Sequence, residues 1–223
     1  VLGAEKPSTN IRDYAPIAKG MEFVYDVKVC AGTEIEKSEI RYLVLGKMPN
    51  RRADSYEVQV ISEDRVDGER LINDRRVVWT VDDASNSVIH EYLLLDRETG
   101  EMSRRQFEER LKLPRAFSRD EIFGRSGTRP MKVHRQLTRV RGFEGCLLVE
   151  TVHSDQRTYR YYKKGVGLVA LEVFQIDDPH PGTVRGGVGS RGAKDRPLFA
   201  VDRQNPGKLV YARYLRLPPP ANS

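Results

Sequence analysis

The sequence predicts a mainly β fold, a curled antiparallel sheet shaped as a half-barrel, with one short helical segment and a flexible C-terminal tail. Apolar and polar residues alternate in many segments of strand length, which is the pattern of half-buried strands. Polar turn residues separate these segments at intervals of about ten to fifteen residues. The 223 residues, 39% of them hydrophobic and 31% charged, suffice for one sizeable domain. No apolar run reaches the roughly 18 residues that a membrane-spanning helix needs.

The first expected strand, residues 21–30, shows the alternation most clearly. Phe23, Tyr25 and Val27 point to one side, while Asp26 and Lys28 make the other side polar. Further strands are expected over residues 35–45, 56–62, 75–81 and 87–95, with a turn at 82–86. Short connections of this kind favour an antiparallel meander.

The pattern changes after residue 96. Residues 102–113 contain few β-branched residues and many helix formers, with Ser103 as an expected N-cap and Pro114 as the terminator. A short helical turn is expected over 119–123, and a glycine- and proline-containing loop from Gly124 onward. The sequence therefore predicts a helical insert near residues 102–123.

The remaining strands and the domain limits follow from composition. Strands are expected over residues 131–140, 145–153, 158–162 and 168–176. These limits predict an N-terminal tail over 1–12, a β domain over 13–176, and a basic tail rich in glycine and proline over 177–223. Within that tail, residues 209–217 are either one more strand or a short amphipathic segment.

Net charge is +6, and the basic residues are concentrated in two blocks. Lysine and arginine exceed acidic residues by seven over 101–141 and by five over 178–223. The basic strand offers an anion-binding set made of Lys132, Arg135, Arg139 and Arg141. A solvated basic face explains the same pattern, and without a recognition signature we do not expect nucleic acid as the partner.

The sequence contains no catalytic or metal motif, and we expect neither a metal nor a cofactor. The four histidines, His90, His134, His153 and His180, are isolated, and no pair has metal-ligand spacing. Cys30 and Cys146 either form a disulfide in an oxidising compartment or remain buried thiols. The side chains conceivable for acid–base work are His90, Glu91, Glu150 and His153.

Two segments resemble a known group of proteins. Residues 14–25 (Y-A-P-I-A-K-G-M-E-F-V-Y) resemble the opening Y-x-P-x-x-x-G-x-x-W-x-Y of a group of bacterial secreted proteins and lipoproteins, with Phe23 where the group often has Trp. Residues 143–150 and 161–169, the latter ending in G-V-G-L-V, resemble its closing hairpin. The resemblance implies an extracytoplasmic curled sheet, similar in style to envelope lipoprotein carriers whose half-open barrel is closed by a helix. It implies no catalytic residues.

These observations lead to the hypothesis of a non-enzymatic binding or scaffold domain. We expect a periplasmic or envelope location after removal of a signal peptide, and a concave sheet face that holds an apolar ligand or a protein segment, with residues 102–113 as a lid. The expected ligand-binding side chains are Phe23, Tyr25, Trp79, Leu93, Leu148 and Tyr161, with Val27 and Leu168 as further candidates. Three alternatives remain open: a closed core without a cavity, a cofactor-free enzyme that uses the same concavity, and a binder of anionic polymers.

Overall fold

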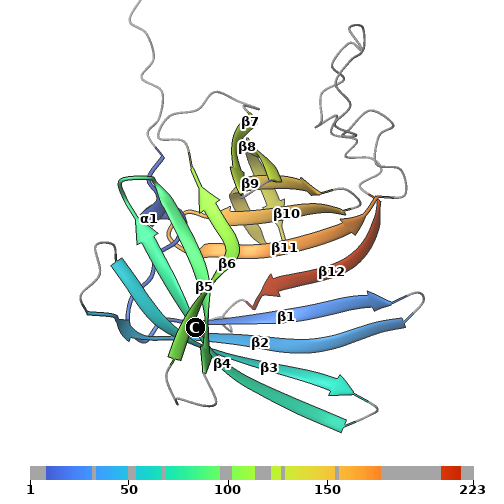
Figure 1. The fold of residues 1–223 in the computed structure, drawn as a ribbon. Coiled ribbons are helices and arrows are strands. Elements are labelled where there is room, and N and C mark those ends of the chain that lie inside the picture. The colour runs from blue at the N-terminus through green and yellow to red at the C-terminus, as the bar shows by residue number, and fades with distance from the viewer. Residues whose placement is uncertain are drawn as a thin grey trace, which may run out of the picture.

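The computed structural model describes residues 9–31, 34–49, 54–66, 69–95, 102–113, 122–126, 129–153, 156–176 and 207–216. Within these ranges the protein is a single antiparallel sheet of 12 strands that is not closed into a barrel (Figure 1). The strand order across the sheet is β6-β5-β4-β3-β2-β1-β12-β11-β10-β9-β8-β7. The expected fold class, a mainly β chain with a curled antiparallel sheet, is confirmed.

One short helix precedes the strands. The elements are α1 (Ile11–Tyr14), β1 (Glu22–Ala31), β2 (Glu34–Lys47), β3 (Asp54–Val66), β4 (Glu69–Asp82), β5 (Ser87–Leu95), β6 (Met102–Lys112), β7 (Ile122–Ser126), β8 (Arg129–Val140), β9 (Phe143–His153), β10 (Gln156–Lys163), β11 (Gly167–Gln175) and β12 (Lys208–Leu215). All nine segments that the alternation predicts as strands before residue 177 lie within or overlap these strands.

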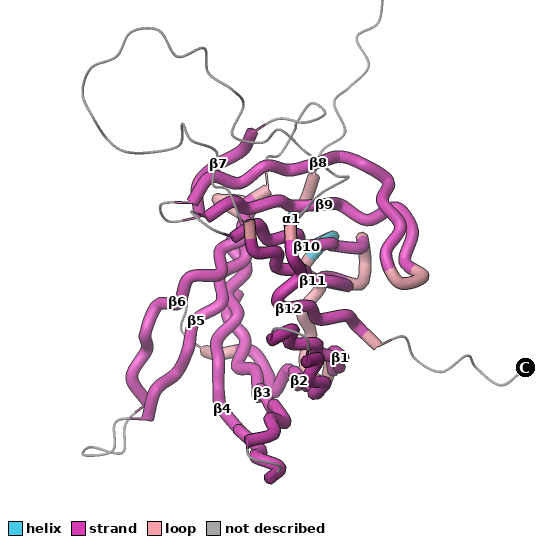
Figure 2. Tube along the Cα trace, turned by 90° about the vertical axis from the view of Figure 1, so that its right-hand side faces the viewer, coloured by secondary structure: helices cyan, strands magenta, loops and turns pink. Residues whose placement is uncertain are grey.

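The sheet curls around a core, and the view in Figure 2 shows strands β3–β6 and strands β8–β11 on different sides of β1 and β12. We call the side of Phe23 and Tyr25 the inner face and the opposite side the outer face. The alternation in β1 places Phe23, Tyr25 and Val27 in the core, with 7%, 4% and 3% of their surface exposed. Burial of such apolar side chains is the main favourable term in folding.

The C-terminal strand lies in the middle of the sheet. β12 pairs with β1 on one side and with β11 on the other (Figure 1). Val27 and Leu171 are therefore both register partners of Arg213. The expectation that the domain ends at residue 176 is therefore wrong, because residues 208–215 join the two halves of the sheet. Of the two alternatives for residues 209–217, a strand or a short amphipathic segment, the structure shows the strand, and residues 177–206 lie outside the described ranges.

The expected helix over 102–113 and its role as a lid are wrong. These residues form β6, which pairs with β5 and places Leu111 opposite Val88 in the core. The pairing supplies backbone hydrogen bonds and buries Leu111, which outweighs the weak local preference for a helix. β7 begins at Ile122, inside the helical turn expected over 119–123, and continues into the loop expected from Gly124, where β8 also begins at Arg129. Residues 119–121 lie outside the described ranges.

The helix of the described structure is α1, which begins near the expected start of the domain. Asn10 is its N-cap and accepts a hydrogen bond from the Arg12 amide at 3.0 Å. Ile11 is fully buried, and the Arg12 guanidinium pairs with Asp54 at 2.8 Å and Asp83 at 2.6 Å. The expected N-terminal tail is therefore too long, because residues 11 and 12 belong to the domain.

Asn86 holds this N-terminal segment on the sheet. Its side chain accepts a hydrogen bond from the Ile11 amide at 2.8 Å and donates to the carbonyls of Thr9 at 2.9 Å and Leu113 at 2.8 Å. Asn86 has a φ of +51°, a conformation that asparagine tolerates better than most residues. The predicted turn at residues 82–86 thus also fixes the position of α1.

Candidate functional site

Residues 13–16 and the turn between β10 and β11 meet at one end of the curled sheet. The Gly165 amide donates to the Asp13 carbonyl at 2.7 Å, and Lys164 pairs with the Asp13 carboxylate at 3.1 Å. A side chain at Gly167 would meet Pro16 at 3.6 Å, and the φ of +102° there favours glycine. The N-terminal segment after α1 and the turn between β10 and β11 therefore close this end together.

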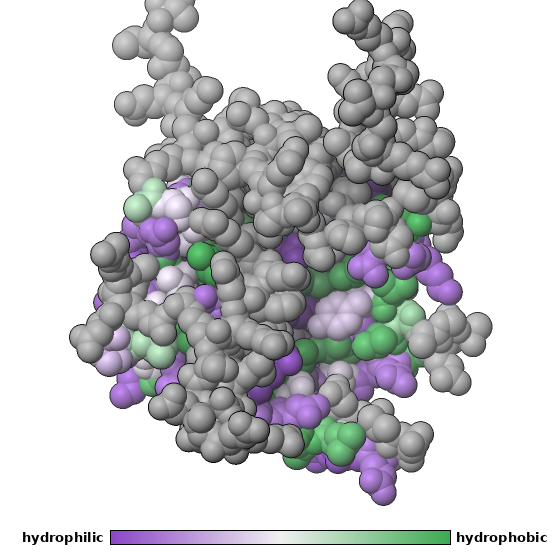
Figure 3. Space-filling view, in the orientation of Figure 1, coloured by the Kyte–Doolittle hydropathy of each residue, from purple (hydrophilic) through white to green (hydrophobic). Residues whose placement is uncertain are grey.

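An apolar pocket lies inside this closed end. It has a volume of about 60 Å³, measured over the positions that the centre of a water molecule can occupy. Fifteen residues line it: Tyr14, Ala15, Pro16, Ile17, Phe23, Tyr25, Tyr42, Trp79, Val88, His90, Leu111, Tyr162, Gly167, Leu168 and Arg213. Figure 3 shows apolar side chains gathered along β11, β12 and β1 on the face turned to the viewer. This lining suits an apolar group.

Trp79 is the centre of the aromatic wall of this pocket. Its ring lies 5.9 Å from that of Phe23 and 5.4 Å from that of Tyr42, measured between centroids. The His90 ring stacks on it at 4.8 Å with an interplanar angle of 20°. β4 carries Trp79 and β5 carries His90, and these two residues are register partners. Such ring pairs give the wall a fixed shape.

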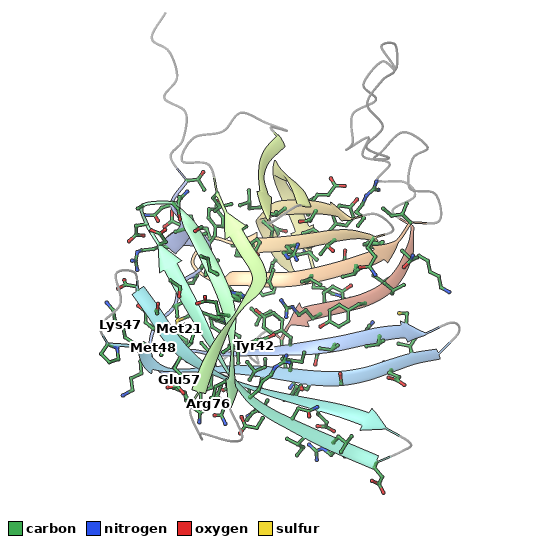
Figure 4. All side chains as sticks on the ribbon, in the orientation of Figure 1. Met21, Tyr42, Lys47, Met48, Glu57 and Arg76 are labelled. Atoms are coloured by element: carbon green, nitrogen blue, oxygen red, sulfur yellow. The ribbon has the colours of Figure 1, made fainter. Side chains whose placement is uncertain are left out.

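A second pocket, polar in character, adjoins the first. Its volume, measured in the same way, is about 230 Å³. Its lining residues are Ile40, Tyr42, Val60, Arg75, Val77, Trp79, His90, Glu91, Tyr211 and Arg213. Four of these, Tyr42, Trp79, His90 and Arg213, also line the apolar pocket. Figure 4 labels Tyr42 on β2, and Glu57 and Arg76, which form an ion pair at 2.9 Å between β3 and β4.

Arg213 joins the two pockets, and the sequence analysis missed it. Its Nη1 donates to the Tyr42 hydroxyl at 2.9 Å, and its guanidinium carbon lies 5.5 Å from the centroid of the Tyr25 ring. Tyr25 in turn donates to the Leu168 carbonyl at 2.8 Å. The alternation around Arg213 is visible in the sequence, but only the pairing of β12 with β1 and β11 places its side chain on the inner face.

His90 and Glu91 are neighbours in β5, and both line the polar pocket. The pairing of β5 with β4 is regular here, with His90 opposite Trp79 and Glu91 opposite Val78. The register shift between β5 and β6 places the extra residues on β6, because Glu91 alone stands opposite residues 106–108.

The expected ligand-binding residues divide into three groups. Phe23, Tyr25, Trp79 and Leu168 line the apolar pocket, and Val27 is a buried inner-face neighbour of Arg213. The expectation for Leu148 and Tyr161 is wrong about the face. Arg213 lies opposite Leu171, Leu171 opposite Arg160, and Arg160 opposite Val149, so these four residues share the inner face. Leu148 and Tyr161 are their chain neighbours and therefore point to the outer face. The side chain of Leu93 lies outside the described residues.

The outer face of β10–β12 carries a cluster of hydrogen-bonded tyrosines. Glu172 accepts from the hydroxyl of Tyr161 at 3.2 Å and from that of Tyr214 at 2.7 Å. Burial and the neighbouring Glu172 carboxylate raise the pKa of Tyr161 far above its usual value, and the same causes raise the pKa of Tyr214 to about 12. Both tyrosines therefore stay neutral donors at physiological pH.

The other acid–base candidates do not join His90 and Glu91. Glu150 is fully buried and pairs with Arg157, with 3.1 Å between Oε1 and Nε. The side chain of His153 lies outside the described residues. Both Cys30 and Cys146 are free thiols, and burial raises the pKa of the Cys146 thiol. The described residues contain no group of three histidine, cysteine, aspartate or glutamate side chains able to hold a metal ion.

The expected anion-binding set is described in part. Arg139 is exposed and lies 3.4 Å from Glu144, while the Arg141 guanidinium lies over the Tyr214 ring at 4.3 Å. The side chains of Lys132 and Arg135 lie outside the described residues. In the part of the chain that the structure covers, no helix is long and apolar enough to cross a membrane.

Comparison with known proteins finds no family model, no curated protein and no solved structure that matches this chain.

Proposed function

We propose that this protein is a non-enzymatic binding domain that holds an apolar group in the pocket at the closed end of its curled sheet. One observation carries the proposal: the curled sheet encloses space next to Trp79, and aromatic and aliphatic side chains from strands on both sides of β1 line it. A core packed to ordinary density leaves few voids larger than one water molecule. The resemblance of residues 14–25 and 161–169 to envelope proteins supports a place in the bacterial cell envelope.

The single tryptophan of the chain allows a direct test, because Trp79 lines the pocket. The neutral apolar dye N-phenyl-1-naphthylamine should bind and quench Trp79 fluorescence by energy transfer. Ala15 lines the pocket, so the substitution Ala15→Leu should fill it and weaken dye binding at least about tenfold.

Ala84→Leu is the matched control, because Ala84 is exposed in the turn before β5. It should leave dye binding unchanged, and circular dichroism should show that both variants keep the sheet. A folded wild-type protein that leaves the dye unbound would contradict the proposal, and so would equal affinities for the wild type and a folded Ala15→Leu variant.

A cofactor-free enzyme is the second candidate, favoured because His90 and Glu91 both line the polar pocket. Histidine and glutamate are among the side chains that most often transfer protons in enzymes. The measurement is hydrolysis of p-nitrophenyl esters of graded chain length by the wild type and by His90→Gln. Turnover that His90→Gln abolishes, while dye binding persists, would favour the enzyme over the simple binder.

A further inference from the structure

The first half of β4 runs along an edge of the sheet. The pairing of β4 with β5 ends at Val77 opposite Tyr92, although β5 continues to Leu95. In the described part of the chain, residues 69–75 therefore continue the ladder on the β3 side alone. Figure 1 shows the β3–β4 hairpin at the lower right, where its end projects past β5 and β6. We call residues 69–75 the β4 edge segment.

The β4 edge segment is exposed on both faces, and its exposed surface is partly apolar. All of its residues are exposed, including Leu71 on the inner face and Ile72, with 62% of its surface exposed, on the outer face. A strand edge with exposed apolar side chains offers backbone hydrogen-bonding groups and apolar surface to another strand. This segment has the features of a strand-pairing surface.

The charges of the β4 edge segment are complementary to those of a second copy. Its sequence is E-R-L-I-N-D-R. If two copies run antiparallel with Ile72 at the centre, Glu69 stands opposite Arg75 of the second copy and Arg70 stands opposite Asp74. Each of these pairs occurs twice about a twofold axis. Opposite charges at directly facing positions stabilise an antiparallel pair of strands.

The neighbouring registers lack this match. With Asn73 at the centre, Arg70 would stand opposite Arg76, and like charges at facing positions are destabilising. With Leu71 at the centre, Arg70 would stand opposite Ile72, which leaves the charge without a match. The sequence therefore favours one register for the pairing of this segment with itself.

The contacts that the segment makes within the chain are compatible with such pairing. Arg70 contacts Glu63 of β3 at 2.6 Å, and Asp74 accepts a hydrogen bond from Gln59 of β3 at 2.8 Å. A strand inside a sheet has a neighbour on each side, and a carboxylate or a guanidinium group can form several hydrogen bonds. The pairing with a second copy therefore requires no side chain to leave its present contact.

We propose that this protein forms a homodimer by antiparallel pairing of two β4 edge segments, with Ile72 at the twofold axis. The partner is a second copy because the segment matches itself in charge. A ladder of this length is small compared with the interface of a stable dimer, so the dimer forms only at high protein concentration. None of residues 69–75 lines the apolar pocket, so dimer formation and dye binding are tested separately.

The first experiment measures the oligomeric state of the full chain by sedimentation equilibrium, from about 1 µM to about 1 mM, the range of weak protein pairs. The wild type should pass from monomer to dimer within it. Ile72→Lys places two like charges at the twofold axis and should weaken the dimer at least about tenfold. Ile35→Lys is the matched control, because Ile35 is 61% exposed on the β1–β2 hairpin, and it should leave the dimer unchanged.

A mixing experiment tests the register. Arg70→Glu has carboxylates at both positions 70 and 74, and Asp74→Arg has guanidinium groups at both, so each variant alone should dimerise at least about tenfold more weakly than the wild type. An equal mixture of the two variants places a carboxylate opposite a guanidinium at both pairs and should restore the dimer. Arg216→Glu, at an exposed arginine that pairs with Asp26, is the control and should dimerise as the wild type does.

Three results would overturn the proposal. The first is a wild type that stays monomeric up to about 1 mM. The second is a dimer of unchanged affinity in Ile72→Lys that circular dichroism shows to be folded, because the dimer would then use another surface. The third is a mixture of folded Arg70→Glu and Asp74→Arg that dimerises no better than either variant alone.

Discussion

The β1–β2 hairpin and strands β9–β11 are built from similar alternating sequences, yet they use their two faces differently. In β1, Phe23 and Tyr25 are buried on the inner face, while Glu22 and Asp26 on the outer face are exposed. In β9, the six consecutive residues 146–151 are all buried, so both faces are covered. The hairpin therefore buries one face and exposes the other, whereas β9 exposes neither face over residues 146–151.

Where both faces of β9–β11 are buried, their polar side chains pair with each other. Glu150 and Arg157 form a buried ion pair, and Glu172 accepts hydrogen bonds from Tyr161 and Tyr214. Buried polar groups keep their stability cost low only when they are bonded. In β1 and β2 the outer-face charges, such as Asp26 with Arg216, face solvent instead.

The difference shows what alternation can establish. It assigns residues to one side or the other, but it identifies the core side only where the opposite side is polar. The sequence favours the concave face for Leu148 and Tyr161 because they are apolar and aromatic, but β9–β11 carry such residues on both faces.

The largest expected effect tests whether β12 unites the two regions. Ala212 is fully buried between Lys28 of β1 and Glu172 of β11. The substitution Ala212→Asp buries a carboxylate next to another carboxylate, so the free energy of unfolding should fall by about 4 kcal/mol or more. Urea denaturation followed by circular dichroism measures the loss.

Lys208→Asp is the control, an exposed residue at the start of the same strand, and should cost less than about 0.5 kcal/mol. If Ala212→Asp cost as little as Lys208→Asp, β12 would not be a strand of the core, and a domain ending at residue 176 would be the better description.

The next effect contrasts the ion pairs of the two regions. Arg157→Met removes one member of the buried pair and leaves Glu150 charged in the core, which should lower the free energy of unfolding by about 3–5 kcal/mol. Arg76→Met is the matched change in the half-exposed pair with Glu57 on β3 and β4, and should cost about 1 kcal/mol or less.

A double variant sharpens this contrast. Glu150→Leu combined with Arg157→Met removes both charges, and replacement of a buried ion pair by apolar side chains is often nearly neutral. The double variant should therefore be more stable than Arg157→Met alone. If Arg157→Met and Arg76→Met lowered the free energy of unfolding by similar amounts, the burial of both faces of β9–β11 would not determine how much an ion pair contributes to stability.

Much of the strand map could be predicted from the sequence, because each strand carries its own alternation and its own turn. The failures lie where long-range pairing decides. Residues 102–113 lack β-branched residues and favour a helix locally, yet pairing with β5 makes them a strand. α1 has only four residues, too short for a periodic signal.

The candidate site was predictable only in part, for the same reason. Phe23 and Tyr25 lie in a strand whose inner face is clear from the pattern. Residues 77–81 around Trp79 are all buried, so the pattern alone does not give the face of Trp79. Arg213 lies beyond a long glycine- and proline-rich segment, and its partner Val27 is on the first strand, so no local signal connects them. Glu91 lines the polar pocket together with its chain neighbour His90, which the alternation of the strand does not predict.

The smallest expected effect concerns an exposed charge cluster at the start of β3, and it tests the solvent-facing side of the comparison through pH. Asp54 pairs with Lys47 and with Arg12, whose hydrogen bonds hold the pKa of the Asp54 carboxyl below its usual value. A lowered pKa in the folded state means that the carboxylate stabilises the fold above the unfolded-state value, and that this contribution is lost as pH falls through the folded-state value. Asp54→Asn should thus cost up to about 1 kcal/mol at neutral pH, and the difference from the wild type should shrink as pH falls from about 4 through the folded-state pKa. Urea titrations at several pH values measure this difference in the free energy of unfolding. High salt should also reduce it, whereas the loss for Arg157→Met should change little with salt because that ion pair is buried.

A loss for Asp54→Asn that stays constant from neutral to acidic pH would mean that the amide disturbs packing, and that the charge pairing at this end of the sheet contributes nothing measurable.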